Sequence, residues 1–588
     1  MKYITITILF LICITGSFCQ GLTVHGKRII NNKGEEIILR GMGLGGWMLQ
    51  EPYMLQLSGV AIAQHDIKRK IKELAGDEIT EKFYEAWLKN HCTKADIDSL
   101  AAWGFNSVRL PMHYNLFTLP VEEEPVPGKH TWLKKGFDLT DNLLSWCKAN
   151  KIYLILDLHA APGGQGNDNA IADRDTSKPS LWQSELNRQK TIALWEKLAS
   201  RYANEEWIGA YDLINEPNWG FENATDKNGC AENKNEPLTQ LLKDITTAIR
   251  KVDKKHIIII EGNCWGNNYD NMFPLWDDNL IMSFHKYWNH TDQNSIQKFL
   301  DYREQYNVPI WMGESGENSN TWFTSTIELL EKNKIGWAWW PLKKSGINNP
   351  LEVKMNDGYK KIIDYWKGKG EKPTQLAASK ALLQFAVDAN ISNNIIHRDV
   401  IDAMIRQVTS KTVIPFNKNI INNQSILYAV DYDMGRINYA YYDVDSGNYW
   451  VSTGKRTEWN KGWQYRNDGV DIEACNDSVS NGYSIGWTED GEWLHYTVFA
   501  DHEGSYNIDL RYAAPVKGKV QFMINDYPSA IIDLEPTISY TSWQSSITTT
   551  VQLKKGSNSI KLLIFKGAIN LNYIQFIYQS TTANINHK

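Results

Sequence analysis

Residues 208–217 read IGAYDLINEP, an apolar run that ends in an amide, an acid and a proline. The run is typical of a buried strand, and the strand is expected to stop at Pro217, which cannot donate to a β-ladder. Asn215 and Glu216 are therefore predicted at a strand end, where packing gives little reason for a carboxylate. A second acid presented in the same way would make Glu216 a candidate for chemistry.

Seven further runs of this kind begin near residues 40, 106, 153, 256, 280, 308 and 336. Segments with helical periodicity separate most of them, such as FDLTDNLLSWCKAN and NRQKTIALWEKLASRYA. Near-continuous apolar strands suit a parallel sheet that is covered on both faces. Eight such strands alternating with helices predict an α/β fold, a (β/α)8 TIM barrel.

Polar and aromatic side chains follow the ends of these runs, and Glu314 in WMGES is the second acid. The C-terminal ends of the strands carry the active site in such a barrel, so Glu216 and Glu314 are expected to face each other. Packing readily explains one strand-end histidine or tyrosine, but it is a poor explanation for a whole set at one end. The set is Arg109, His159, Asn215, Glu216, His285, Tyr287, Glu314 and Trp340.

Two carboxylates on either side of a glycosidic bond are the apparatus of glycoside hydrolysis. One is a protonated acid and the other an ionised nucleophile, so their surroundings must differ. Tyr287 and Arg109 are expected to keep Glu314 ionised by donating to it. The others are expected to meet the sugar or the acid: Asn215 a hydroxyl, Trp340 the ring face, and His159 and His285 either hydroxyls or the acid.

The pieces SVRLP, DLH, NEP, HKY, GES and WWPLK resemble glycoside hydrolase family 5 across roughly residues 21–390. The resemblance implies a retaining mechanism without a cofactor, with Glu216 as acid/base and Glu314 as nucleophile. Within the family, LRGMGLGGWMLQEPYM and DLHAAPGGQGNDNA resemble exo-β-1,3-glucanases and β-glucosidases of lipid glucosides, which makes Glu51 and Asn169 candidate sugar ligands. Asn167 stands where an aromatic residue is expected, which leaves exo cutting and the linkage open.

A chain of 588 residues is too long for one core and predicts two or three domains. Its formal net charge of −6 gives no electrostatic reason to expect nucleic acid or an anionic membrane as partner. Its 24 Trp suit stacking surfaces for sugar rings as well as a core. The expected partner is a polysaccharide or oligosaccharide, and the protein is expected to be a monomer.

The first residues, MKYITITILFLICITGSFCQG, combine one lysine, an apolar run and small residues. This is typical of a secretory signal, which we expect to cover residues 1–19 and to leave a secreted or periplasmic protein with its barrel at residues 20–390. A lipid anchor on Cys19 is the less favoured alternative, because Phe18 precedes it. No later run is long and apolar enough to cross a membrane. Five of the seven Cys lie beyond the signal, and they show neither metal-ligand spacing nor a disulfide framework.

The pattern changes after residue 390. Residues 391–424, with the Asn-rich VIPFNKNIINNQS, are expected to form a loose connector. Residues 425–580 contain alternating runs such as GEWLHYTVFA and GSYNIDLRYAA, which predict an all-β jelly-roll sandwich. No acid pair or metal cluster stands out there, so a binding module is favoured over a second enzyme.

The stretch YRNDGVDIEACNDSVSNGYSIGWTEDGEWLHYTV, with INLNYIQF near the end, resembles carbohydrate-binding module family 6. The resemblance implies a cleft in which two aromatic residues hold a sugar and an asparagine orients it, here Trp487, Trp543 and Asn570. Either tryptophan could instead belong to the core. The family's calcium-binding glutamates are replaced by Tyr428 and Val430 in LYAVDYD, which argues against a structural calcium.

These features predict a secreted retaining β-glycoside hydrolase that cleaves β-glucan, β-1,3-linked before β-1,4-linked, with an appended polysaccharide-binding module. Two alternatives stay open: a β-glucosidase acting on small or lipid-linked glucosides, and a non-catalytic carbohydrate-binding protein. The module favours a polymer, and the intact acid pair argues against an inert barrel. Because the barrel residues all lie upstream, removal of residues 425–588 is expected to spare activity on short oligosaccharides.

Overall fold

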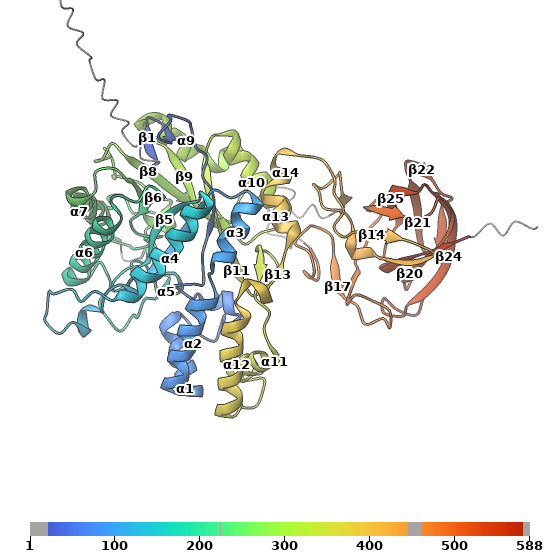
Figure 1. Ribbon diagram of the computed structural model, residues 1–588, viewed down its shortest axis with the longest axis horizontal. Coiled ribbons are helices and arrows are strands. Elements are labelled where there is room, and N and C mark those ends of the chain that lie inside the picture. Colours follow the sequence, from blue (N-terminus) through green and yellow to red (C-terminus); the bar gives the residue numbers. More distant parts are fainter. Residues whose placement is uncertain (1–20, 224, 445–459, 580–588) are drawn as a thin grey trace, which may run out of the picture.

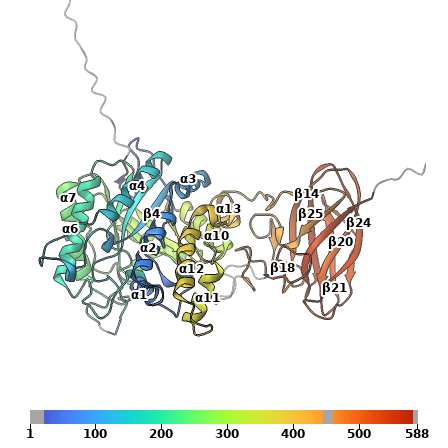
Figure 2. The same ribbon diagram turned by 60° about the horizontal axis from the view of Figure 1, so that its bottom comes forward.

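A computed structural model describes residues 21–223, 225–444 and 460–579. The predicted signal segment, including Cys19, lies outside these residues. Two domains follow each other along the long axis of the molecule (Figures 1 and 2). Among the described residues, no helix is both long and apolar enough to cross a membrane.

The first domain is a closed barrel with the strand order β10-β3-β4-β5-β6-β7-β8-β9, in which all neighbours pair in parallel. These are the eight runs predicted from the sequence, so the barrel fold is confirmed. Nearly all their residues are buried, because helices cover the outer face and side chains fill the interior. The strands are β3 (Arg40–Gly43), β4 (Ser107–His113), β5 (Tyr153–Ala160), β6 (Ile208–Asp212), β7 (Ile257–Glu261), β8 (Leu280–His285), β9 (Ile310–Gly316) and β10 (Gly336–Trp340).

Helices fill the connections between these strands. α7 shows why they form: Pro237 lies in its first turn, Arg250 and Lys251 in its last, and Leu238 and Ile245 lie on its buried face. Among the helices between strands are α3 (Lys94–Trp103), α4 (Lys134–Asn150), α5 (Asn169–Ala172), α6 (Glu185–Tyr202), α7 (Glu236–Val252), α8 (Asn263–Gly266), α9 (Gln297–Tyr306) and α10 (Asn320–Lys332).

Four further helices form a group with its own apolar core, which projects downward in Figure 1. Ile29 of the hairpin of β1 and β2, and Leu22 just before the hairpin, join a cluster with the barrel interior. The added elements are β1 (Thr23–His25), β2 (Arg28–Ile30), α1 (Gln64–Ala75), α2 (Asp77–Asn90), β11 (Lys343–Lys344), β12 (Leu351–Glu352), α11 (Asp357–Trp366) and α12 (Gln375–Asp388).

Residues 391–424 differ from the predicted loose connector. They hold β13 (Ile395–Ile396), α13 (Arg398–Met404), α14 (Arg406–Thr409) and β14 (Asn419–Ile421). Val400, Met404 and Val408 belong to the core cluster of the barrel. Their side chains pack on the barrel because the helical spacing of these apolar residues gives α13 and α14 a buried face.

The second domain is the predicted all-β sandwich. One sheet has the order β14-β19-β25-β21-β22 and the other β17-β18-β26-β20-β24. Buried and half-buried residues alternate strictly along β19, as expected for a strand with one face on the core. The strands are β15 (Gln424–Tyr428), β16 (Tyr441–Tyr442), β17 (Ile472–Ala474), β18 (Tyr483–Ile485), β19 (Trp493–Ala500), β20 (Gly504–Ala513), β21 (Gly518–Ile524), β22 (Tyr527–Pro528), β23 (Ile532–Leu534), β24 (Gln544–Leu553), β25 (Gly556–Lys566) and β26 (Asn570–Tyr578).

Candidate active site

The C-terminal ends of the barrel strands surround a cavity of about 750 Å³. Two predicted residues, Arg109 and Asn215, lie beneath it and are fully buried. Asn169 is not among the lining residues, although its neighbours Asp168 and Ala170 are. The predicted residues that line the cavity are Glu51, His159, Glu216, His285, Tyr287, Glu314 and Trp340.

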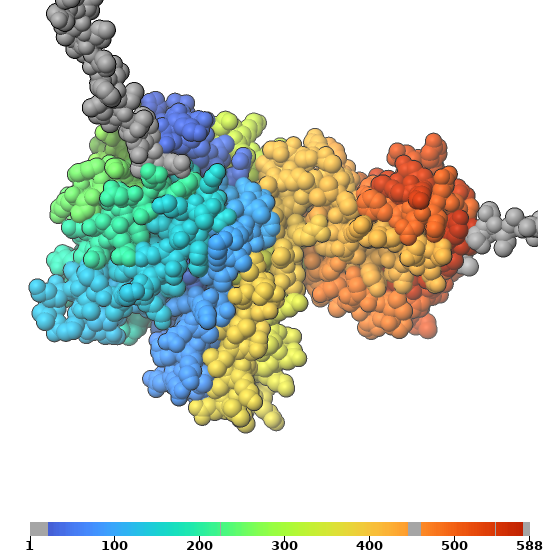
Figure 3. Space-filling model, viewed as in Figure 1, coloured from blue at the N-terminus to red at the C-terminus, as the bar shows by residue number. Residues whose placement is uncertain are grey.

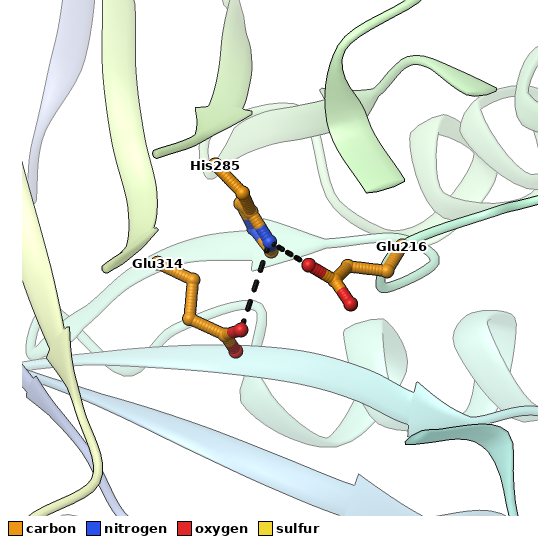
Figure 4. Close-up of side chains that lie close together, drawn as sticks. All are labelled: Glu216, His285 and Glu314. Carbon is orange, nitrogen blue, oxygen red and sulfur yellow. Dashed lines mark hydrogen bonds and ion pairs between the residues drawn. The ribbon is translucent and has the colours of Figure 1, made fainter. Parts of the chain in front are cut away.

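Glu216 and Glu314 point toward each other across His285 (Figure 4). His285 Nδ1 lies 2.6 Å from Glu216 Oε1 and 3.7 Å from Glu314 Oε2. One oxygen of each carboxylate and one imidazole nitrogen lie within 4.8 Å of one another. These atoms could also surround a cation, but the short contact to His285 already provides Glu216 with a hydrogen-bond partner.

Arg109 is the centre of the polar layer below the cavity. Its guanidinium donates to Glu314 Oε1 at 2.9 Å, to Asn215 Oδ1 at 2.8 Å, to Asp212 Oδ2 at 2.9 Å and to Glu261 Oε1 at 3.0 Å. Burial acts to lower the pKa of Arg109, but the surrounding carboxylates raise it well above its ordinary value. The guanidinium therefore stays charged and bridges side chains of β6, β7 and β9.

Tyr287 completes the surroundings of Glu314. Its hydroxyl donates to Glu314 Oε2 at 3.0 Å, so each oxygen of this carboxylate accepts a hydrogen bond from a different residue. Burial raises the pKa of Glu314, and His285 and Arg109 oppose that rise. Two donors to one carboxylate favour its ionised form.

Glu216 has different surroundings, as unequal roles require. Burial raises its pKa, and its side chain accepts a hydrogen bond from His285. Burial acts to lower the pKa of His285, but Glu261, Glu314 and Glu216 raise it well above its ordinary value. His285 and Glu216 are therefore electrostatically linked through the 2.6 Å contact between Nδ1 and Oε1.

Trp340 is locked in place at the edge of the cavity. Its ring stacks on His159 at 4.9 Å and 8°, and its indole donates to Tyr53 Oη at 3.1 Å. A Cβ on Gly43 or Gly45 would lie 2.5 or 2.7 Å from the Trp340 ring, so only glycine leaves room for it.

His159 is held in one tautomer. Burial lowers its pKa to about 3, which leaves the imidazole neutral. Its Nδ1–H donates to Asp157 Oδ2 at 2.7 Å, and Asn215 Nδ2 lies 3.3 Å from its Nε2.

Glu261 is a residue of the site that sequence reasoning missed. It ends β7, and its Oε2 accepts the backbone N–H of Glu216 at 2.7 Å. This contact supports Glu216, whose φ of 44° lies in the left-handed region. Burial acts to raise the pKa of Glu261, but His285 and Arg109 lower it to about 2. The sequence did contain a sign of this residue. Glu261 ends the apolar run IIIIE, just as Glu216 and Glu314 lie at the ends of their own apolar runs.

The wall of the cavity includes other residues that the motifs did not predict. They come from loops after different strands: Tyr53, Trp265, Trp288 and Glu317. Asn167, at the position of the expected aromatic residue, instead donates to Lys227 O at 2.6 Å and accepts from Arg174 at 2.8 Å. Loop lengths after strands carry no periodic signal, so these residues could not be placed from the sequence.

Two cysteines pair beside the cavity, which corrects the expectation that the cysteines define no disulfide. Cys230 and Cys264 form a disulfide with a Cα–Cα distance of 4.7 Å. Their sequence separation of 34 hid this pairing, since only the barrel brings together the loops after the adjacent strands β6 and β7. The bond ties down the segment that carries Trp265.

The sandwich brings its three predicted residues into one region. Trp487 is 42% exposed, and Trp543 is half-buried. Asn570 is buried, and its amide donates to Glu473 Oε1 at 2.6 Å and to Tyr540 O at 3.0 Å. Tyr540 lies in the same chain segment as Trp543. Its side-chain oxygen lies beside Gly486, next to Trp487. The amide of Asn570 is therefore held rigidly by the protein itself.

A closed barrel with two adjacent buried carboxylates at the C-terminal ends of its strands defines a glycoside hydrolase. The family model "Cellulase (glycosyl hydrolase family 5)" matches residues 69–346, and the model "Carbohydrate binding module (family 6)" matches residues 463–578. Residues 69–346 therefore form a glycoside hydrolase family 5 domain, and residues 463–578 form a C-terminal carbohydrate-binding module of family 6.

Several curated proteins are similar to part of the chain. A beta-xylosidase of Phanerodontia chrysosporium is 26% identical over 375 residues, which cover 58% of this chain and 74% of that protein. "Probable glucan 1,3-beta-glucosidase A" of Aspergillus niger is 30% identical over 186 residues, covering 31% of this chain and 41% of that protein. Endoglucanase C of Acetivibrio thermocellus is 24% identical over 327 residues, which cover 44% of this chain and 88% of that protein.

Proposed function

We propose that the protein is a retaining β-glucan hydrolase that acts by double displacement, with Glu314 as nucleophile and Glu216 as acid/base. The observation that carries this proposal is the short distance between the two carboxylates, of which one oxygen each lies within 4.8 Å of the other. Retaining enzymes have carboxyls about 5–5.5 Å apart, whereas inverting enzymes need about 6.5–9.5 Å to admit a water.

In the first step, Glu314 attacks the anomeric carbon while Glu216 protonates the leaving oxygen. Arg109 and Tyr287 hold the two oxygens of Glu314 and keep it ionised. In the second step, Glu216 accepts a proton from water, which displaces Glu314 from the sugar. Asn215, oriented by Arg109, is proposed to donate to the hydroxyl next to the reacting carbon.

The proposed substrate is β-glucan, with β-1,3 linkages preferred to β-1,4. The glucan 1,3-beta-glucosidase name of one relative and the polymer-binding module support this assignment. The alternatives are a β-glucosidase of small or lipid-linked glucosides and a non-catalytic carbohydrate-binding protein. The beta-xylosidase name of another relative adds xylosides to the substrates to be tested.

A substrate panel tests this proposal. Laminarin, mixed-linkage glucan, cellulose, mannan, and aryl β-glucoside and β-xyloside are incubated with the protein, and proton NMR follows the first product formed. We expect the fastest release from laminarin, with the β-anomer appearing first. An α-anomer first would exclude retention, and no turnover of any substrate would favour the non-catalytic alternative.

The protein is also proposed to be a secreted monomer. A disulfide such as Cys230–Cys264 persists in oxidising compartments, which supports export from the cytoplasm. Mass spectrometry of the culture medium, with N-terminal sequencing, should find a mature chain that begins after Cys19.

The dependence of kcat/KM on pH is expected to be bell-shaped. Glu314 must be ionised, so activity is lost as the pH falls through its pKa; Glu216 must be protonated, so activity is lost as the pH rises through its pKa. Burial raises both pKa values, so both limbs should lie above the ordinary glutamate range. The limbs belong to the pair rather than to one residue. A flat profile from about pH 4 to 9 would contradict acid catalysis by Glu216.

Trp487→Ala and Trp543→Ala are each expected to weaken binding to soluble β-glucan about tenfold or more, since an aromatic platform contributes much of the binding of a sugar ring. Affinity electrophoresis in laminarin gels measures this loss. Tyr527→Ala is the control, because Tyr527 is an 80% exposed aromatic on β22 of the same domain. Equal retardation of all variants would show that the cleft lies elsewhere.

A further inference from the structure

Two residues of the cavity wall near the proposed nucleophile Glu314 have left-handed backbone conformations. Glu317 follows β9 and lines the cavity with a φ of 53°, and Trp288 lines it from the neighbouring loop with a φ of 46°. The indole of Trp288 donates to Glu317 O at 3.1 Å, so the two residues form one wall. Left-handed backbone is unfavourable for such side chains and persists only where the surroundings impose it.

Residues of the sandwich domain bind the segment that follows Glu317. Asn467 Nδ2 donates to Asn318 O at 2.8 Å and to Asn320 Oδ1 at 3.1 Å, directly after Glu317. The backbone N–H of Asn320 donates in turn to Asn467 O at 2.9 Å. The segment between β9 and α10 is therefore bound from both its backbone and its side chains.

Asp468 adds a second link across the same interface. Its Oδ1 accepts from Asn320 Nδ2 at 2.9 Å, and that amide also donates to Asp399 Oδ2 at 2.8 Å. Within the sandwich, Asp468 Oδ2 accepts from Arg466 at 2.6 Å and from Tyr432 at 3.1 Å. The sandwich side of the link is thus rigid.

These groups are shielded from water. Asn318, Asn320, Asn467 and Asp468 are all buried, and Arg466 lies over the rings of Tyr432 and Phe416 at 3.7 and 4.5 Å. Buried hydrogen bonds lack a competing solvent, so they hold geometry more firmly than exposed ones. In the space-filling view, the gold segment near residue 400 lies against the orange sandwich domain (Figure 3).

We propose that Asn467 and Asp468 are positioning residues for substrate binding, which hold the Glu317–Trp288 wall in its binding geometry. The sandwich then completes the cavity of the barrel, in addition to any glycan binding of its own. This inference rests on the proposed function of the cavity. It also reverses the expectation that removal of residues 425–588 spares activity on short substrates.

The test uses the full chain and an aryl β-glycoside too small to reach the sandwich cleft. Asn467→Ala is expected to raise KM about tenfold while kcat changes less than about threefold, because Glu216 and Glu314 are held by the barrel itself. Glu328→Gln is the control. It removes the negative charge that meets Arg436 at 3.0 Å, elsewhere on the same interface, and should leave KM unchanged.

A double-mutant cycle separates positioning from general loosening. In Glu317→Ala, the wall has already lost its side chain, so adding Asn467→Ala should raise KM much less than it does alone. Asn467→Asp keeps the shape of the side chain but loses the two N–H donors, so it should raise KM as Asn467→Ala does. If circular dichroism shows that Asn467→Ala does not fold, Asn467→Asp takes its place in the test.

Three outcomes would overturn the inference: an unchanged KM in the Asn467 variants, an equal rise in Glu328→Gln, or additive effects with Glu317→Ala. The proposed function fails separately, if the wild-type protein turns over no glycoside or if Glu314→Gln retains its activity. If the wild-type protein is active and its activity depends on Glu314, but KM is unchanged in Asn467→Asp, only the positioning role of Asn467 is contradicted.

Discussion

Glu314→Gln is expected to lower kcat by roughly 10⁴–10⁶-fold on every substrate, whatever its leaving group. Glutamine has nearly the shape of glutamate but cannot form the covalent glycosyl-enzyme intermediate. The Arg109 and Tyr287 contacts that hold the carboxylate have no other role in the proposed mechanism than to support this step. Initial rates on an aryl glycoside and on laminarin measure the loss.

The covalent intermediate can be detected directly. A 2-deoxy-2-fluoro glycoside with a good leaving group should add one sugar mass to the wild-type protein, located on Glu314 by peptide mass spectrometry. Glu328→Gln, at a 53% exposed side chain on α10, is the matched control and should react as the wild type does. Substantial turnover by Glu314→Gln, or a label on another residue, would contradict the assignment of the nucleophile.

Glu216→Ala is expected to lower kcat/KM by about 10²–10⁴-fold on substrates with poor leaving groups, because these need protonation of the departing oxygen. Dinitrophenyl glycosides need no such proton, so their first step should be largely spared. Azide, which needs no base, should then restore the second step and yield a β-glycosyl azide. His285, left without its partner at 2.6 Å, should lose the upward shift that Glu216 gives its pKa.

Parallel measurements on a series of aryl leaving groups separate the two roles. For Glu216→Ala, the rate should depend much more steeply on leaving-group acidity than for the wild type. Equal losses on all leaving groups, without rescue by azide, would show that Glu216 does not act as the acid/base.

Much of the site could be predicted because the barrel converts linear order into spatial order. An apolar run in a parallel barrel has one C-terminal end, and all these ends lie on one face. Glu216 and Glu314 lie far apart in sequence yet are adjacent in space, and the sequence already shows both at run ends. The same rule would have found Glu261, which ends β7.

The wall of the cavity follows no such rule. Trp288 lies on a loop, and Trp265 lies in the short segment α8, where its backbone is non-helical. The paths of both segments depend on contacts with other loops, as the pairing of Cys230 with Cys264 illustrates. Glu317 adopts left-handed backbone, which no local propensity of glutamate predicts.

The sequence by itself determined the strands, their order and which carboxylates lie at their ends, because hydrophobic periodicity and chain order decide these. It also determined that an all-β domain follows. Only the tertiary structure decided that residues 395–409 pack on the barrel and that Asn467 binds the segment after Glu317. Hydrogen bonds between buried polar groups of distant segments depend on how two surfaces meet, and a linear pattern of polar residues carries no information about that meeting.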